Sequence, residues 1–157
     1  MKILFLILIL FYSFDFKSQT DSLPELNEQI FLFVKSQIGK RVGRGECWDL
    51  AKIPLTKFNA KWDGKFDFGK ELDWKKDKIL PGDIIQFQNV QIEYQDGSRV
   101  IKESYPQHTA IIYQVISKNE YFVAQQNTET NGKKVSIDKL YFDKIRKGKI
   151  LVYRPEK

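Results

Sequence analysis

The chain is poor in two reactive residue types, because its 157 residues include one cysteine and one histidine. A single cysteine excludes an intramolecular disulfide. One cysteine with one histidine cannot supply the four ligands of a structural zinc site. We therefore expect a domain that folds around an apolar core without crosslinks and that needs no metal or other cofactor.

A long apolar run opens the chain, in residues 3–14, directly after the positive charge of Lys2. The run is too short to span a bilayer and has the length typical of a secretory signal. We predict that residues 1–19 are a signal peptide, cut between Lys17 and Thr20, and that the protein is secreted or periplasmic without stable membrane insertion. The alternatives are an uncleaved anchor and a buried first strand. No cysteine stands near the cut, which excludes lipid attachment there.

The rest of the chain, residues 20–157, has the length of a single domain and contains no internal repeat or low-complexity tract. The formal net charge is +6, which favours attraction to anionic surfaces such as wall polymers. Lys and Arg are scattered rather than clustered, so we expect no nucleic-acid partner.

Two helices are predicted in the first part of this domain. Ser22 and Glu25 form a capping-box pair, and Gly39 is a C-terminal stop. Between these signals, apolar residues recur at helical spacing: Leu23, Leu26, Ile30, Phe33, Val34 and Ile38. A second helix should begin near Glu46, and Pro54 should kink it or end it early. Its inward-facing residues are expected to be Cys47, Leu50, Ala51 and Phe58.

The remainder is predicted to be a long loop followed by strands. Residues 61–78 are charged and aromatic without a firm period, and we interpret them as a loop that walls a cleft. Leu80-Pro81-Gly82-Asp83 is a turn into the first strand, and Gln95-Asp96-Gly97-Ser98 is the turn of a hairpin. Strands are expected at 84–87, 90–94, 99–102, 108–116, 120–126 and 149–154. N-terminal helices packed on an antiparallel sheet make an α+β fold.

Cys47 is the first candidate for chemistry. It follows Gly43-Arg44-Gly45-Glu46 and is expected to open the second helix. The unpaired N–H groups and the dipole of a helix N-terminus favour negative charge, so the pKa of a thiol there falls below its free value of about 8.5. The thiolate is a nucleophile. The alternative is that Cys47 is a small buried hydrophobe.

His108 is the matching candidate for a general base. It stands at the start of an apolar strand, and a base at the leading edge of a strand can face a helix N-terminus that packs on the sheet. The alternative is an ordinary histidine at the edge of the sheet. A cysteine–histidine pair usually needs a third group to orient the imidazole.

The segment Gln125-Gln126-Asn127 offers amides that could orient the imidazole. Strand alternation would point Gln125 and Asn127 to one face and Gln126 to the other. An amide can accept the imidazole N–H but carries no charge, so it stabilises an imidazolium less than a carboxylate does.

Four blocks of the sequence resemble the successive motifs of the CHAP amidases, which are papain-like cysteine hydrolases related to the NlpC-type peptidases. The blocks are Gly45-Glu46-Cys47-Trp48, Leu80-Pro81-Gly82-Asp83-Ile84-Ile85-Gln86-Phe87, His108-Thr109-Ala110-Ile111-Ile112 and Gln125-Gln126-Asn127. Their order and spacing match over residues 38–155. The ending Ile150-Leu151-Val152-Tyr153-Arg154-Pro155 resembles a branch found as small free-standing domains.

The resemblance implies a papain-like fold and cleavage of amide bonds in peptidoglycan peptides. It implies that Cys47 is the nucleophile and His108 the base. The family pattern places a carboxylate after the histidine strand, then one residue, then an asparagine. Here Gln125 stands at the carboxylate position and Asn127 at the asparagine.

We therefore predict a cysteine amidase or endopeptidase with Cys47, His108, Gln125 and Asn127 as its site residues. Its partner would be peptidoglycan or another amide-containing anionic wall polymer. Backbone N–H groups near the helix start would hold the oxyanion. Two alternatives remain open. One is a non-hydrolytic module that binds wall glycopeptide or protein, and the other is an acyltransferase or hydrolase that acts on lipids.

Overall fold

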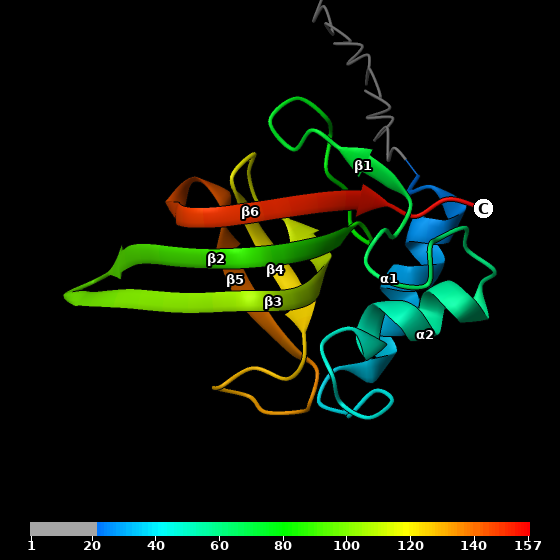
Figure 1. Cartoon of the computed structure of the whole chain (residues 1–157), viewed down its shortest axis with the longest axis horizontal. Coiled ribbons are helices and arrows are strands. Elements are labelled where there is room, and N and C mark those ends of the chain that lie inside the picture. The colour runs from blue at the N-terminus through cyan, green and yellow to red at the C-terminus, as the bar shows by residue number, and fades with distance from the viewer. Residues whose placement is uncertain (1–21) are drawn as a thin grey trace, which may run out of the picture.

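The computed structural model describes residues 22–157, which form two α-helices and one six-stranded sheet. The helices are α1 (Glu25–Gln37) and α2 (Asp49–Lys57). The strands are β1 (Lys70–Leu72), β2 (Ile84–Asp96), β3 (Arg99–Val115), β4 (Glu120–Gln125), β5 (Ser136–Tyr141) and β6 (Ile145–Arg154), with a short 3-10 helix, η1 (Phe142–Lys144), before β6. Neighbouring strands pair antiparallel in the order β1-β6-β2-β3-β4-β5. The predicted α+β fold is confirmed (Figure 1).

The two α-helices lie together beside one end of the sheet, and the β2–β3 hairpin extends away from them (Figure 1). Ile30 and Val34 of α1 and Leu50 of α2 are fully buried. These side chains share a core cluster with residues from one face of the sheet, including Ile84 and Ile111. The helical periodicity of the sequence therefore buries an apolar stripe against the sheet, as predicted.

The opposite face of the sheet is buried as well. Successive strand residues alternate between faces, so Ile85 and Ile112 belong to a second core cluster, together with Val123 and others. Tyr94 of β2 packs on Tyr141 of β5 with ring centroids 4.9 Å apart, although the two strands are not neighbours in the sheet. The sheet is therefore curved strongly enough for the edge strand β5 to approach β2 across the second core cluster.

Helix α1 begins later than the sequence predicted. Its N-cap is Pro24, and no side chain caps it, so the Ser22 capping box is wrong. Proline supplies a φ of −52° at this position, which suits the entry to a helix. The helix ends at Gln37, and Gly39 follows with a φ of 77°. The predicted C-terminal stop is therefore confirmed.

Helix α2 also begins later than expected. It starts at Asp49, so Cys47 precedes the helix instead of opening it. The helix passes through Pro54 and continues to Lys57. The proline removes one backbone donor, but it does not end the helix. Leu50 and Ala51 face the core as predicted.

The predicted hairpin around Asp96 and Gly97 is confirmed, with Asp96 paired to Arg99. The short strand segments predicted on either side merge into the two long strands β2 and β3. Two strands were not predicted. Strand β1 interrupts the loop of residues 61–78, and β5 follows β4 at the edge of the sheet.

A buried ion pair joins the start of β2 to the end of β6. Asp83 is fully buried and accepts hydrogen bonds from Nε of Arg154 at 3.1 Å and from Nη2 at 2.8 Å. Asn27 of α1 donates to the same carboxylate at 2.8 Å. The predicted turn at Leu80-Pro81-Gly82-Asp83 is thus a junction of a helix and two strands.

The predicted signal peptide, residues 1–19, and its cleavage site lie outside the described residues. Within residues 22–157, no helix is long and apolar enough to cross a membrane.

Candidate active site

The Cys47 turn, residues 42–48, leads into α2 and is held by a buried carboxylate. Oδ2 of Asp49 accepts hydrogen bonds from the backbone N–H groups of Arg44, at 2.8 Å, and Glu46, at 3.3 Å. Gly43 adopts a φ of 58°, and a Cβ placed on it would meet the Asp49 side chain at 2.9 Å. Glycine therefore lets the chain wrap closely around this carboxylate. The cysteine that follows is partly buried.

Gln126 attaches the Cys47 turn to the end of β4. The residue is fully buried. Its Oε1 accepts the backbone N–H of Val42 at 3.1 Å, and its Nε2 donates to the carbonyls of Val42 at 3.0 Å and Glu46 at 2.7 Å. These bonds use the acceptor and both donors of the amide. The turn is therefore held against the same sheet that carries the histidine.

His108 lies on β3, paired with Phe87 of β2, and is 5% exposed. Its ring packs against Phe87, with centroids 5.7 Å apart, and against Tyr105, at 5.1 Å. Two aromatic neighbours restrict the orientations that the imidazole can take. The side chain is therefore positioned by the strand pairing and by its packing.

A chain of side-chain hydrogen bonds fixes the state of this imidazole. Nε2 of His108 lies 2.9 Å from Oε1 of Gln125, and Nε2 of Gln125 donates to Oδ2 of Asp138 at 3.0 Å. An amide oxygen can only accept, so Nε2 of His108 carries the proton and donates it. Nδ1 of the neutral ring is then the basic nitrogen.

Cys47 and His108 line the same cavity, which has a volume of about 430 Å³. The backbone N–H of Thr109, the residue after the histidine, faces the thiol. Trp48 and Phe66 form an apolar wall, with ring centroids 6.5 Å apart. Phe66 belongs to the loop that was expected to wall a cleft. The fold thus brings the predicted pair to one site.

Burial raises the pKa of the Cys47 thiol above its ordinary value. The backbone N–H groups of Thr109 and Trp48 act in the opposite direction, and the charge of Glu46 adds to the increase. The expectation of a lowered thiol pKa is therefore wrong. It rested on a position at the helix N-terminus, whereas the cysteine precedes α2.

Burial lowers the pKa of His108, and the hydrogen bond to Gln125 raises it in part. A buried imidazole favours its neutral form because the charged form loses hydration. The two pKa shifts together favour a neutral thiol beside a neutral imidazole at neutral pH.

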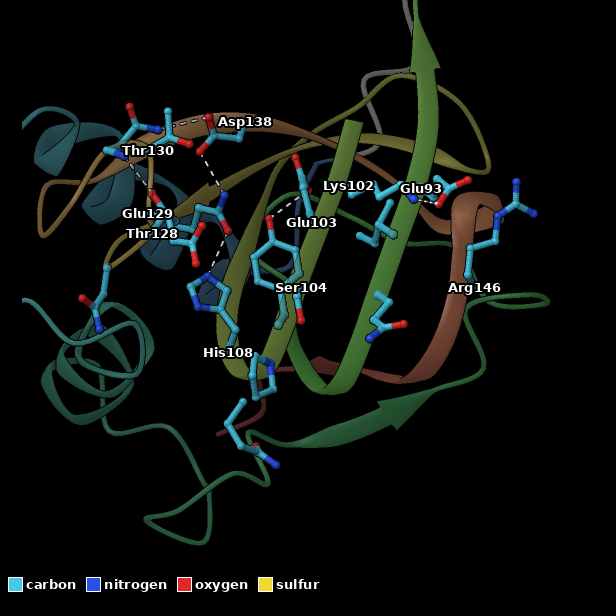
Figure 2. A pocket seen from close by; sticks show the side chains of 18 residues that line it. Glu93, Lys102, Glu103, Ser104, His108, Thr128, Glu129, Thr130, Asp138 and Arg146 are labelled. Carbon is cyan, nitrogen blue, oxygen red and sulfur yellow. Dashed lines mark hydrogen bonds and ion pairs between the residues drawn. The ribbon is translucent and has the colours of Figure 1, made fainter. Parts of the chain in front are cut away.

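A larger cavity of about 670 Å³ lies beside the first, and both are lined by Gln107 and His108. Figure 2 shows carboxylates around it, including Glu103 and Asp138, and dashed lines that lead from His108 through an amide to Asp138. Burial raises the pKa of Glu103. His108 therefore stands where an apolar cavity meets a more polar one. Among residues 22–157, no group of three or more His, Cys, Asp or Glu side chains is placed to hold a metal ion.

Asn127 does not reach the histidine. Strand β4 ends at Gln125, and Asn127 has a φ of 62°, so the alternation of an extended strand does not continue to it. Its Nδ2 donates instead to Oε2 of Glu46 at 3.0 Å. The predicted common face for Gln125 and Asn127 is wrong, and of these two residues it is Gln125 that hydrogen-bonds to the imidazole.

Asp49 and Asp138 were not recognised from the sequence. Asp49 carried a local signal, because an acidic residue in the first turn is typical of a helix start. Asp138 carried none, since the strand that presents it was not predicted and its contact with Gln125 depends on the pairing of β5 with β4.

The chain is similar to known proteins over most of its length. A family model described as the AIM3/BBC1 cysteine proteinase-fold domain matches residues 21–157. "Altered inheritance of mitochondria protein 3" of Debaryomyces hansenii is 25% identical over 146 residues, which cover 82% of this chain and 16% of that protein. The chain therefore spans about a sixth of the length of this relative.

Among solved structures, "The crystal structure of Ly7917" matches with a TM-score of 0.49 and 13% identity, covering 81% of this chain and 62% of that one. The family match supports the prediction of a papain-like cysteine proteinase fold. The finer resemblance to CHAP amidases and NlpC-type peptidases stays a hypothesis.

Proposed function

Because the chain belongs to the family of AIM3/BBC1 cysteine proteinase-fold domains, we propose that it is a cysteine hydrolase that cleaves amide bonds. The observation that carries the proposal is the cavity that Cys47 and His108 share. A nucleophile and a general base that open onto one cavity are the minimal requirement for acyl transfer. The hydrogen bond from Nε2 of His108 to Gln125 leaves Nδ1 free to act as the base.

In the first half-reaction, Sγ of Cys47 attacks the amide carbonyl carbon while Nδ1 of His108 takes the thiol proton. Starting from a neutral pair, this transfer accompanies the attack. Backbone N–H groups that face the sulfur, including that of Thr109, are suited to hold the oxyanion. The imidazolium then gives its proton to the amine nitrogen, the carbon–nitrogen bond breaks, and a thioester remains on Cys47.

In the second half-reaction, a water molecule attacks the thioester carbon and Nδ1 of His108 accepts one of its protons. The carbon–sulfur bond breaks, and Cys47 recovers its proton from the imidazolium. The products are a carboxylic acid and an amine. Apart from this water, the groups that act in both half-reactions are Cys47, His108 and backbone N–H groups of the chain.

The substrate class that we propose first is the peptide stems of peptidoglycan. The predicted export of the chain and its formal net charge of +6 support this choice, because wall polymers are anionic. The apolar wall of Trp48 and Phe66 suits an apolar group next to the scissile bond. The name of the Debaryomyces hansenii relative refers to mitochondrial inheritance and names no substrate.

Digestion of purified peptidoglycan, beside a mixed library of linear peptides and isopeptides, tests the proposal by mass spectrometry of the fragments. The wild type should release fragments with new amino and carboxyl groups. Cys47→Ser, which keeps the size of the side chain, and His108→Ala should release none. Asp143→Asn, at an exposed residue paired with Lys144, is the control variant and should match the wild type. Equal products from wild type and Cys47→Ser would contradict the proposal.

Acid quenching of the reaction, followed by mass measurement of the protein, identifies the acyl group on Cys47. A peptidyl adduct supports the amide hydrolase. A fatty-acyl adduct would instead support action on lipids, and binding of wall fragments without any adduct would support the non-hydrolytic module.

A further inference from the structure

The side chain of Gln125 lies between the imidazole and a carboxylate. Its Oε1 is 2.9 Å from Nε2 of His108, and its Nε2 is 3.0 Å from Oδ2 of Asp138. Gln125 is 4% exposed, so water does not readily compete for these bonds. Figure 2 shows the same path from the imidazole to Asp138.

The two ends of a glutamine amide have nearly the same shape but opposite hydrogen-bonding roles. If the amide of Gln125 were turned over, its NH₂ group would face Nε2 of His108. That nitrogen would then have to accept, and the ring proton would move to Nδ1. In that state the nitrogen assigned to the thiol proton is already protonated, and the imidazole cannot act as the base.

Asp138 decides between the two orientations, because its carboxylate can only accept hydrogen bonds. It therefore holds the NH₂ end of Gln125 and turns the oxygen toward His108. The carboxylate is itself held by Oγ of Ser136, which donates to Oδ2 at 2.6 Å, and by Nδ2 of Asn131, at 3.4 Å from Oδ1. These donors keep the aspartate aimed at the amide.

We propose that Asp138 is a positioning residue that acts through Gln125 to keep the proton of His108 on Nε2 and the base on Nδ1. The proposal rests on the proposed function, in which His108 serves Cys47 as the base. It also accounts for Gln125 at the position where the CHAP pattern has a carboxylate. This chain places an amide in contact with the imidazole and a carboxylate one hydrogen bond further away, on β5.

The other groups near the site do not fill this role. Tyr105 packs on the imidazole through its ring and donates its hydroxyl to Glu103 at 3.0 Å. The NH₂ group of Gln125 also acts as a donor toward the Tyr105 hydroxyl. A hydroxyl can either donate or accept, so Tyr105 is compatible with the observed orientation of the amide but does not enforce it as a carboxylate does. Glu46 pairs with Lys133, at 3.1 Å, and its charge acts on Cys47. Asp138 is thus the carboxylate that is hydrogen-bonded to the amide facing Nε2 of His108.

The only histidine in the sequence makes a direct test feasible. In untagged, ¹⁵N-labelled protein, the ring-nitrogen shifts at about pH 8 report which nitrogen carries the proton. The wild type should show the Nε2–H form. Asp138→Asn removes the acceptor-only group at constant shape, so a substantial Nδ1–H fraction should appear. Turnover should fall at least about tenfold, since the productive form loses population and the imidazolium loses its charged support.

The exchange variant Gln125→Glu with Asp138→Asn is the rescue experiment. It places the acceptor-only group against the imidazole and the amide behind it, so the Nε2–H form should return. Asp143→Asn is the matched control and should leave the ring shifts unchanged. Loss of the Nε2–H form in Asp138→Asn and its recovery in the exchange variant support the proposal.

An unchanged Nε2–H form in Asp138→Asn would overturn the proposal, whatever the rate. The ring-nitrogen shifts do not depend on turnover, so the two failures can be told apart. If the proposed function is wrong, the wild type cleaves no amide substrate, but the ring-nitrogen shifts still differ between the wild type and Asp138→Asn.

Discussion

At the scale of single residues, the burial of Cys47 governs how its thiol reacts. Its pKa lies above the ordinary value because the thiolate would lose hydration. Alkylation by iodoacetamide should therefore be slow at neutral pH and should rise through an apparent pKa above about 8.5. His108→Ala should leave the direction of this profile unchanged. A rate that is already at its plateau near pH 6 would show instead a resting thiolate–imidazolium pair.

The single variant Gln125→Glu tests the contact between residue 125 and Asp138 through its effect on stability. A glutamate there would place two carboxylates against each other, because the Gln125 amide now lies 3.0 Å from Asp138. Like charges so close raise the pKa of one of them and oppose folding at neutral pH. We expect a loss of about 1–2 kcal/mol in the free energy of unfolding, measured in urea at about pH 7. Adding Asp138→Asn should restore most of it, and equal stability of the single and double variants would contradict this account.

At the scale of elements, Gln126 joins the Cys47 turn to β4. Gln126→Ala leaves the buried N–H of Val42 without its acceptor. It also removes one donor each from the carbonyls of Val42 and Glu46, which keep backbone bonds from Gly45 and Asp49. The unsatisfied N–H costs about 1–3 kcal/mol and the two lost bonds to the carbonyls add about 1 kcal/mol, so the free energy of unfolding should fall by about 2–4 kcal/mol. Urea unfolding measures the change.

The matched control for this prediction is Gln114→Ala, since Gln114 is exposed on β3. It should change the free energy of unfolding by less than about 0.5 kcal/mol. Amide exchange at Val42 should also become faster in Gln126→Ala. Unchanged exchange there would mean that the turn is held by Asp49 alone.

The ion pair between Asp83 and Arg154 holds β6 against the start of β2. Arg154→Leu leaves the buried carboxylate without its cation, at a cost of about 3 kcal/mol. Burial already raises the pKa of Asp83, and losing the arginine would raise it further. A carboxyl with a raised folded pKa favours folding at pH values below its unfolded pKa of about 3.9 and loses that contribution as pH rises through the folded pKa.

The loss in Arg154→Leu should therefore be larger at about pH 7 than at about pH 4. Urea unfolding at the two pH values measures the difference. A loss that is the same at both would show that Asp83 does not need the arginine as a counter-charge.

At the scale of the whole molecule, export is the prediction that decides where the domain works. The apolar run of residues 3–14 leads us to expect cleavage between Lys17 and Thr20 in the native host. The new N-terminus would then precede α1, which begins at Glu25. Intact-mass analysis of protein recovered outside the cytoplasm tests this, and a protein that retains Met1 would contradict it.

Several features could be read from the sequence because they depend on neighbours along the chain. The Asp96-Gly97 turn and the apolar spacing of Ile30 and Val34 express local backbone and burial preferences. The pairing of Cys47 with His108 followed from scarcity, since each is the only residue of its kind. These signals were sufficient for the α+β class and for the centre of the candidate site.

The tertiary structure alone decided the rest. Asp138 reaches Gln125 because β5 pairs with β4, and neither that pairing nor its register is encoded in a local period. Asp49 holds the turn that precedes Cys47 by accepting hydrogen bonds from the backbone N–H groups of Arg44 and Glu46. The pKa values of Cys47 and His108 depend on burial, which only the packed molecule creates. Sequence patterns thus determined which residues could react, and contacts between distant strands determined their protonation and orientation.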